Sequence, residues 1–455
     1  MVWKKPGGGY WVGRDPPEGP TQLGIWYPRA GTLGGCDTHN GGITVRPSDW
    51  DWDNIANTTS DASWKHEHML GYFEKLDSSR NRRYFGYHKR STSHDFDVVV
   101  SKDINKHSPD RDFQNDVYQV SFKKDEQGRR YSAGSRVNWA VSTGLPLTVR
   151  FDSLVTQVLI DDHLRATGVE YLEGEKHYKA DPRSDVKGPL RNNTDVRRTA
   201  TATREVIISG GTFNTPQILM LSGIGPKNEL QQHGIRTRVD LPGVGKNLQD
   251  HYEVPVIQKF PRNFTFWSKC TPGSKVNPCY DEWKNNGTGP YTTVGFSEFV
   301  LYTSSVAPRG ERDIIMYGYP DAILGHLPPY TNASDLTGPR LVDGVQFARK
   351  IFATIPGSDA ISKEAYPGLD FASDDKLREY ARAQSYGHHA TGTASIGADD
   401  DPLAVLDANF KVRGVKGLRV VDASIFPAVP GTFPLIAIFM MSEKASDVIL
   451  ADATN

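Results

Sequence analysis

The sequence lacks the features that mark several special classes of protein. Its three cysteines in 455 residues are too few for a disulfide framework, although Cys270 and Cys279 close a short loop and can pair in an oxidising compartment. The longest apolar run, 433–441, is about half of the roughly 20 residues that span a bilayer, so we expect no transmembrane helix. No internal repeat, heptad run or low-complexity tail is present.

The sequence also lacks an excess of either charge. Lys and Arg number 53, Asp and Glu number 54, and the formal net charge is -1. A nearly neutral chain provides no overall field that would attract nucleic acid or an anionic membrane. The chain is long enough for more than one domain, and its composition is that of a globular protein.

The compartment is left open by the sequence. The first residues, MVWKKPGGGYW, contain no apolar stretch of the length that a secretory signal needs. Five Asn-x-Ser/Thr sequons favour, weakly, a secreted glycoprotein; they begin at Asn57, Asn192, Asn263, Asn286 and Asn332.

Two parts of the chain show the alternation of strands and helices that is typical of α/β proteins. LTVRFDSLVTQVLI, from Leu147, predicts two strand segments, and ATGVEYLEG predicts a third that pairs back on them. EVIIS, 205–209, predicts a buried parallel strand, followed by a glycine turn and a helix with Pro216 near its first turn. GLRVVDAS and the long apolar segment from Pro434 predict another strand and helix.

The remaining segments predict a second layer. A helix is expected around 65–76, and 252–373 is rich in Pro, Asn, Gly and aromatics, with strand-like pieces such as FSEFVLYT and DIIMYGY. The turn at Gly210 and Gly211 before its helix has the shape of a phosphate-binding site, since free N–H groups and the helix dipole favour an anion. A tight packing turn of any α/β protein is an equally good interpretation of that segment.

Four blocks in order resemble the glucose-methanol-choline (GMC) flavin oxidoreductases, including fungal-type members such as choline dehydrogenases and aryl-alcohol oxidases. GGTFNTPQILMLSGIGP followed by LPGVGKNLQDHYEVP is similar to the second signature of that family. YPRAGTLGGCDTHNGGITVRP resembles its flavin-contacting loop, and GHHATGTASIG and VRGVKGLRVVDASIFP resemble its C-terminal active-site blocks. The resemblance implies bound FAD and oxidation of an alcohol, with an electron acceptor that reoxidises the flavin.

The resemblance also implies site residues. The glycine loop that would lie against the flavin and its pyrophosphate comprises Asn40, Gly41, Gly42 and Ile43. The strand residue that would meet the adenine is Val155, and the strand end that would hold the phosphate and ribityl region is Asp422 and Ala423. The helix start that would face the electron-rich end of the ring is Pro434 and Leu435. Ordinary loop or core structure is the alternative for each residue alone.

His389 is the catalytic candidate, because it opens the HATGT block that resembles the family's His-x-x-Gly-Thr. A neutral imidazole suits the removal of a hydroxyl proton while hydride leaves carbon. His388 is the alternative base if the alignment slips by one residue, and both histidines can also be structural. No metal site is predicted.

Three departures from the family pattern affect the expected activity. No GxGxxG fingerprint precedes Trp26, so the resemblance predicts a nucleotide-binding unit shortened at its N-terminus. The family's second catalytic position, a His or Asn, falls on Phe433, which cannot form a hydrogen bond. The stretches 94–115 and 331–344 are also shorter than the resemblance predicts.

We therefore expect an α/β protein with an added antiparallel sheet. An FAD/NAD(P)-binding, Rossmann-like domain, incomplete at the N-terminus, would comprise 20–60, 136–255 and 376–455. A substrate-binding α+β domain would comprise 61–135 and 256–375. The leading hypothesis is an FAD-dependent alcohol oxidase or dehydrogenase; a non-catalytic relative, or a lyase or cyclase on the same scaffold, are the alternatives.

Overall fold

The computed structural model describes most of the chain. The described residues are 2–7, 10–12, 18–24, 27–77, 103–118, 121–124, 128–181, 184, 196–259, 268–271, 274–292, 299–318, 337–354, 364–431 and 433–454.

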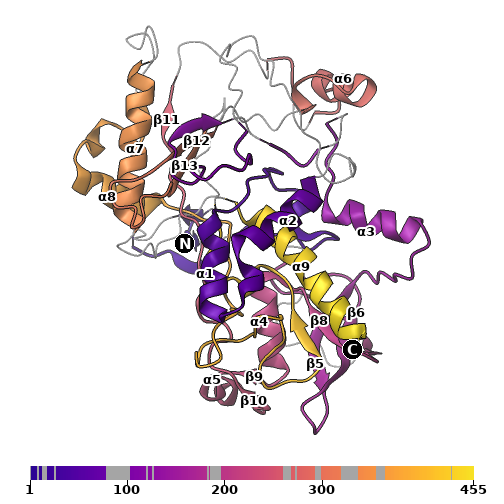
Figure 1. Ribbon diagram of the computed structural model, residues 1–455. Coiled ribbons are helices and arrows are strands. Elements are labelled where there is room, and N and C mark those ends of the chain that lie inside the picture. The colour runs from indigo at the N-terminus through magenta and orange to yellow at the C-terminus, as the bar shows by residue number, and fades with distance from the viewer. Residues whose placement is uncertain are drawn as a thin grey trace.

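The first structural layer is an α/β core (Figure 1). Strands β8 (Val206–Ile208) and β15 (Leu418–Val420) pair in parallel, as the apolar runs EVIIS and GLRVV predict. Helix α4 (Gly211–Leu221) follows β8 after a glycine turn, and the long helix α9 (Pro434–Thr454) runs from the centre of the molecule to the C-terminus. Strands β5 (Ser153–Ile160), β6 (Ala166–Glu173) and β7 (Val196–Thr201) form an antiparallel sheet beside them.

One large apolar cluster holds this layer together. It joins the strands and α9 to helices α1 (Asp49–Thr59) and α2 (His66–Asp77), and its largest members include Trp52, Trp64 and Phe426. Burial of each such aromatic side chain contributes roughly 2–3 kcal/mol to the free energy of folding. Helix α2 thus packs on α9. The expected boundary between the FAD-binding and substrate-binding domains at residue 60 stays a prediction.

The second layer is antiparallel, as the aromatic and Pro-rich middle of the sequence predicts. Strand β12 (Phe299–Tyr302) pairs with β4 (Asp116–Tyr118) on one side and β13 (Ile314–Tyr317) on the other. Strand β11 (Ile257–Gln258) pairs with β14 (Glu364–Tyr366). Helices α7 (Thr337–Thr354) and α8 (Asp374–Gln384) pack against each other at the edge of this layer.

Smaller elements complete the described chain. The shorter helices are α3 (Ala133–Ser142), α5 (Lys227–Gln232) and α6 (Pro278–Asn286). The short strands are β1 (Val2–Lys4), β2 (Tyr10–Val12), β3 (Thr21–Gly24), β9 (Ile224–Gly225) and β10 (Val239–Asp240). Cys279, at the start of α6, forms a disulfide bond with Cys270, as their spacing permits.

Two local predictions were wrong. The segment 147–150 is not a strand, and β5 begins only at Ser153; Leu147 and Phe151 are exposed, so no neighbouring strand pairs with this stretch among the described residues. Pro216 lies in the middle of α4, not near its first turn. It is fully covered by the core there, and its missing N–H is tolerated in that helix.

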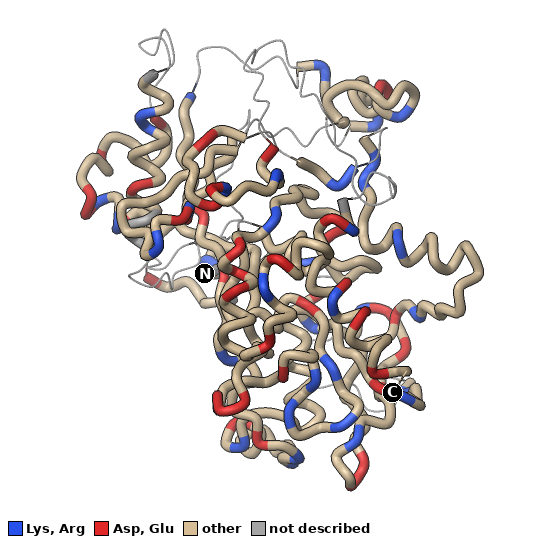
Figure 2. The backbone as a smooth tube through the Cα atoms, viewed as in Figure 1, with Lys and Arg blue, Asp and Glu red and all other residues tan. Residues whose placement is uncertain are grey.

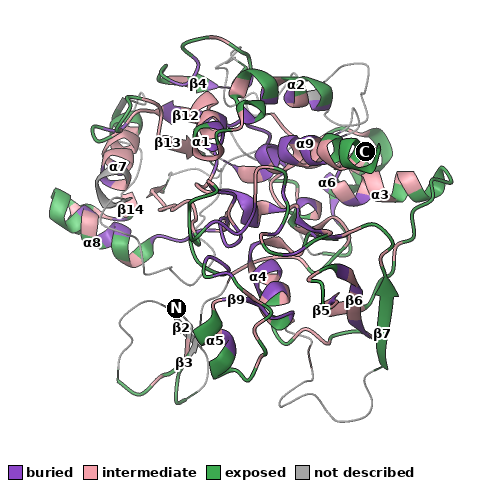
Figure 3. Ribbon diagram, turned by 60° about the horizontal axis from the view of Figure 1, so that its bottom comes forward, coloured by how far each residue is buried: buried purple, intermediate pink, exposed green. Residues whose placement is uncertain are grey.

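The surface agrees with the charge balance of the sequence. In the view of Figure 2, acidic and basic residues are interspersed along the described backbone. The inner part of α9 and α4 is buried, whereas the ends of α5 and α8 are exposed (Figure 3). Among the described residues, no helix is long and apolar enough to cross a membrane.

Candidate active site

The segment 387–390 is held in place by one buried carboxylate. Asp250 accepts a hydrogen bond from the backbone N–H of His389 at 2.7 Å and another from the hydroxyl of Tyr27 at 2.9 Å. The same hydroxyl accepts a hydrogen bond from the N–H of Ala390 at 2.6 Å. Gly387 packs so tightly on the carboxylate that an added Cβ would lie 2.5 Å from it. The backbone on which His389 stands is therefore fixed on both sides.

A second imidazole lies against the ring of His389. The Nδ1 atoms of His251 and His389 are 3.2 Å apart, and the two rings stand at 81° to each other. Neutral imidazole carries one proton on one of its two nitrogens. A hydrogen bond between two Nδ1 atoms therefore requires that one ring donates and the other accepts.

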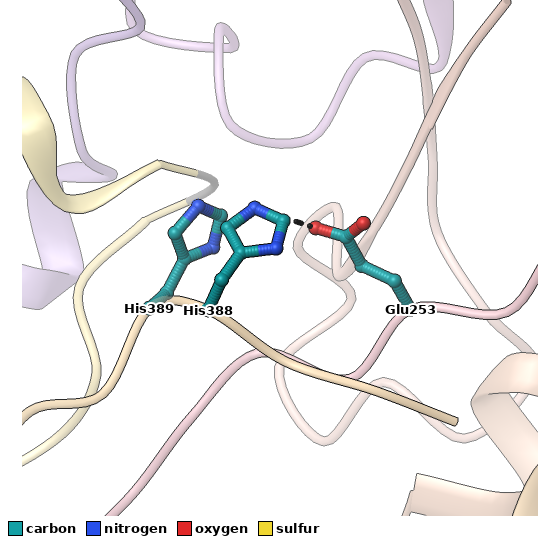
Figure 4. A group of neighbouring side chains, drawn as sticks. All are labelled: Glu253, His388 and His389. Atoms are coloured by element: carbon teal, nitrogen blue, oxygen red, sulfur yellow. Dashed lines mark ion pairs between the residues drawn. The ribbon is translucent and has the colours of Figure 1, made fainter. Parts of the chain in front are cut away.

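His388 points to a different partner. Its Nε2 lies 3.4 Å from Oε1 of Glu253, and Oε2 of Glu253 accepts a hydrogen bond from the hydroxyl of Tyr317 at 2.5 Å. Figure 4 shows the rings of His388 and His389 side by side, with the carboxylate beyond His388. No regular strand runs through these residues, and the two neighbouring imidazoles have separate partners.

The aromatic side chain at the second catalytic position contacts the imidazole directly. The rings of Phe433 and His389 are edge to face, with centroids 5.2 Å apart. Phe433 stacks on Phe299 of β12 at 5.7 Å and lies 5.9 Å from the ring of Tyr317 in β13. The antiparallel layer thus contributes apolar side chains next to His389.

Burial keeps all three imidazoles neutral. Desolvation lowers the pKa of His251 to about 4, and the same cause lowers the pKa of His388 to about 4. Desolvation, and then the neighbouring His388 and His251, lower the pKa of His389 well below its usual value. The lowered pKa of His388 disfavours the charged form that an ion pair with Glu253 would need.

The same residues bring together atoms that a metal ion could use. Glu253, His388 and His389 each offer a ligand atom, and these atoms lie within 4.8 Å of one another. The resemblance implies an organic cofactor at this place, and each of the three residues already has a partner in the protein.

The predicted flavin loop is tied down by a buried basic cluster. Arg130 donates to the side-chain oxygen of Asn40 at 2.9 Å and also to its backbone carbonyl. Lys123 donates to Asp37 at 2.6 Å, and its pKa is lowered to about 8 by burial. Gly42, at φ 67°, needs the left-handed conformation that glycine adopts without strain.

The loop also approaches the site itself. Ile43 belongs to the apolar cluster that contains Phe433 and Phe299. The amine of Lys123 lies 3.8 Å from the ring centroid of Phe439 in α9. Ile43 of the predicted loop therefore shares an apolar cluster with Phe433, the residue before α9.

The glycine turn before α4 already has an anion. One oxygen of Asp422 accepts hydrogen bonds from the N–H of Gly211 at 3.0 Å and the hydroxyl of Thr215 at 2.6 Å. Its other oxygen accepts from the N–H of Ser424 at 2.7 Å. The packing interpretation of this turn is thus the one that the geometry favours, because a carboxylate of the protein occupies the place where a phosphate would bind.

The other predicted residues fall in two places. Ala423 accepts a hydrogen bond from the N–H of Gly392, which links the end of β15 to the His389 segment. Pro434 and Leu435 begin α9 directly after Phe433. Val155 lies in β5 opposite Tyr171, and β5 packs along α4. Val155 thus lies in the antiparallel sheet, whereas Ala423 bonds the segment that follows His389 and Pro434 and Leu435 form the first turn of α9.

Several residues that shape the site carry no prediction from the sequence. They are Tyr27, Arg130, Asp250, His251 and Glu253. The LQDH block, 248–251, contained a signal, because an adjacent acid and histidine inside a matching signature are candidates for the site. Tyr27 and Arg130 offered no such signal, because only the folded chain brings them near the loop and the imidazole.

Comparison with known proteins gives one family. Models described as GMC oxidoreductase match residues 21–253 and 329–442. An oxygen-dependent choline dehydrogenase of Brucella ovis is 30% identical, over 93% of this chain and 82% of the relative. The mitochondrial choline dehydrogenase of Homo sapiens is 28% identical, over 93% of this chain and 76% of the relative.

Solved structures of the same kind share the fold. Formate oxidase of Aspergillus oryzae has a TM-score of 0.72 at 20% identity, covering 93% of this chain and 84% of that one. An FAD-dependent oxidoreductase from Chaetomium thermophilum has a TM-score of 0.74 at 19% identity, covering 94% and 87%. A fungal aryl-alcohol oxidase has a TM-score of 0.67 at 20% identity, covering 94% and 87%.

Proposed function

Because this chain belongs to the GMC oxidoreductase family and is an FAD-dependent oxidoreductase acting on alcohols, we propose that His389 is its catalytic base. One observation carries the proposal. His389 is a half-buried imidazole whose pKa is lowered by desolvation, whose backbone is fixed by Asp250 and whose ring contacts His251. A base must be unprotonated and correctly oriented before the substrate arrives, and both conditions are met.

The residues around His389 fit a flavin at one side of the site. Among the described residues, no hydrogen bond occupies the N–H groups of Leu435 and Ile436 in the first turn of α9. Free N–H groups and the helix dipole attract negative charge, and this end of the helix adjoins Phe433 and His389. The electron-rich end of a flavin is a suitable occupant of that place.

The loop residues supply the second half of the flavin site. Asn40, Gly41, Gly42 and Ile43 would hold the ring and its phosphate side, with Arg130 keeping the loop in shape. Asp422 and Ala423 would approach the ribityl region with oxygens, since the N–H groups of the α4 turn are already satisfied by Asp422. When bound, the flavin supplies the hydride acceptor.

The chain's own residues perform the proton transfer. The free ring nitrogen of His389 accepts the hydroxyl proton of the substrate as the C–H bond breaks. Phe433, stacked on Phe299, excludes water from one side of the imidazole and offers no hydrogen bond to the substrate oxygen. A single imidazole therefore performs the acid-base chemistry at this position.

The substrate and partners are proposed more broadly. A small or medium-sized alcohol would donate the hydride, and a separate electron acceptor would reoxidise the flavin.

We also propose that the chain matures in an oxidising compartment, which the bond between Cys270 and Cys279 supports. The sequons at Asn57 and Asn286 are exposed, whereas those at Asn192, Asn263 and Asn332 lie outside the described residues.

Anaerobic reduction of the purified flavoprotein tests the function. A panel of alcohols should bleach the visible flavin band, and His389→Ala should abolish bleaching while flavin stays bound. His388→Ala is the matched control and should retain bleaching, because His388 faces Glu253. Undiminished bleaching in the His389 variant contradicts the base assignment. A bound flavin that no alcohol reduces favours the lyase or cyclase alternative, and protein that binds no added FAD favours the non-catalytic one.

A further inference from the structure

The contact between His251 and His389 constrains where the protons lie. The two Nδ1 atoms are 3.2 Å apart, and burial keeps both rings neutral at neutral pH. Exactly one of the two Nδ1 atoms can then carry a hydrogen. If His251 donates, the proton of His389 must be on Nε2 and its outer nitrogen cannot act as a base. If His389 donates, its Nε2 has a free lone pair.

The proposed role of His389 as base decides between these two arrangements. Because Nδ1 of His389 faces His251, the nitrogen left to accept a substrate proton is Nε2. A base needs a free lone pair on that nitrogen, so the hydrogen of His389 lies on Nδ1 and is donated to Nδ1 of His251. A neutral His251 then carries its own hydrogen on Nε2.

We propose that His251 is a positioning residue that fixes the tautomer of His389, with hydrogen on Nδ1 and the basic lone pair on Nε2. The proposal rests on His389 being the base. It assigns to a neutral imidazole the orienting task that a carboxylate performs in other catalytic histidine pairs.

The neighbouring acids do not compete for this task. Asp250 uses its oxygens on the backbone N–H of His389 and the hydroxyl of Tyr27, and Glu253 faces His388 and Tyr317. The hydrogen-bond partner of the His389 ring is Nδ1 of His251, at 3.2 Å. The tautomer of the base therefore follows from the contact between the two imidazoles.

Two substitutions at one position separate orientation from packing. In His251→Asn the side-chain oxygen lies near the place of Nδ1 and can accept from His389, whereas His251→Leu fills the space without an acceptor. In the holoenzyme, we expect His251→Leu to lower kcat for alcohol oxidation on the order of 10²-fold, with a small change in KM. His251→Asn should recover most of that loss.

A direct measurement of the tautomer completes the test. Two-bond proton-nitrogen spectra of holoenzyme labelled with 15N-histidine, assigned by comparison with His389→Ala, should show the hydrogen of His389 on Nδ1. The signal should persist in His251→Asn and change to mixed or Nε2-bound hydrogen in His251→Leu. A hydrogen on Nε2 in the wild type overturns the proposal, as does equal activity of the Leu and Asn variants. If His389→Ala retains activity, the base assignment fails instead, and the tautomer measurement still stands by itself.

Discussion

The ring of Phe433 stands edge-on to the imidazole of His389, with the ring centroids 5.2 Å apart. This contact fills the place where the family pattern has a polar second residue. The relationship joins the apolar cluster of the antiparallel layer, through Phe299, to the histidines of the α/β core. If His389 is the base as proposed, this contact leaves it without a second polar residue at that position.

We expect Phe433→Asn to raise kcat/KM for alcohols, because an amide beside His389 can bind the substrate oxygen as charge develops on it. Phe433→Leu is the control, since it keeps an apolar side chain and should not raise the rate. Steady-state kinetics of both variants with one alcohol decide the matter. No gain for Asn over Leu would show that the substrate oxygen does not approach this position.

The network under His389 should matter for stability as well as rate. Tyr27→Phe removes the hydroxyl that donates to Asp250 and accepts from Ala390, leaving that buried N–H without this partner. We expect a loss of about 1–3 kcal/mol in the free energy of unfolding, measured by denaturant titration. Tyr178→Phe offers a hydroxyl control, as Tyr178 bonds Asn214 and Arg29 away from the imidazole. It should leave kcat unchanged, whereas Tyr27→Phe should lower it.

Acid should destabilise the protein through its buried histidines. Burial lowers the pKa of His388 to about 4, whereas an unfolded histidine has a pKa of about 6.5. The unfolded state therefore binds the proton first as the pH falls from about 6.5 towards 4, and stability is lost in that window. Asp51 and Asp250 oppose this loss, because burial raises the pKa of each to about 6 and the folded state binds their protons first.

Comparison with His388→Gln isolates the histidine contribution. We expect the thermal midpoint of the variant to fall less than that of the wild type between pH 7 and pH 5. From the unfolded pKa of about 6.5 down to pH 5, the lost stability amounts to at most about 2 kcal/mol. Parallel pH profiles for the two proteins would show that His388 does not change its proton uptake on folding.

Asn286 offers a test of the compartment. It is exposed at the end of α6, before Gly287 in the left-handed conformation, and the disulfide-bonded Cys279 lies in the same helix. Expressed through a eukaryotic secretory pathway behind a supplied signal, the chain should carry a glycan there, seen as a mass shift that Asn286→Gln reduces by one glycan. An unmodified Asn286 would argue against the secretory route.

The sequence by itself determined the elements whose pattern is local and strong. The apolar runs EVIIS and GLRVV become the parallel pair β8 and β15, and the long segment from Pro434 becomes α9. The spacing of Cys270 and Cys279 permitted their bond. The HATGT block selected His389 as the base, a prediction that still awaits measurement, and the family's second catalytic position fell on Phe433.

Only the tertiary structure decided what surrounds that base. Tyr27, Asp250 and His251 reach His389 from segments more than 130 residues away in the chain, and no local pattern encodes such distances. Folding also placed the carboxylate of Asp422 on the turn before α4, where the sequence left phosphate binding and packing equally possible. Segment 147–150 has the residues of a strand, yet it forms none, because a strand needs a partner that only the assembled sheet provides.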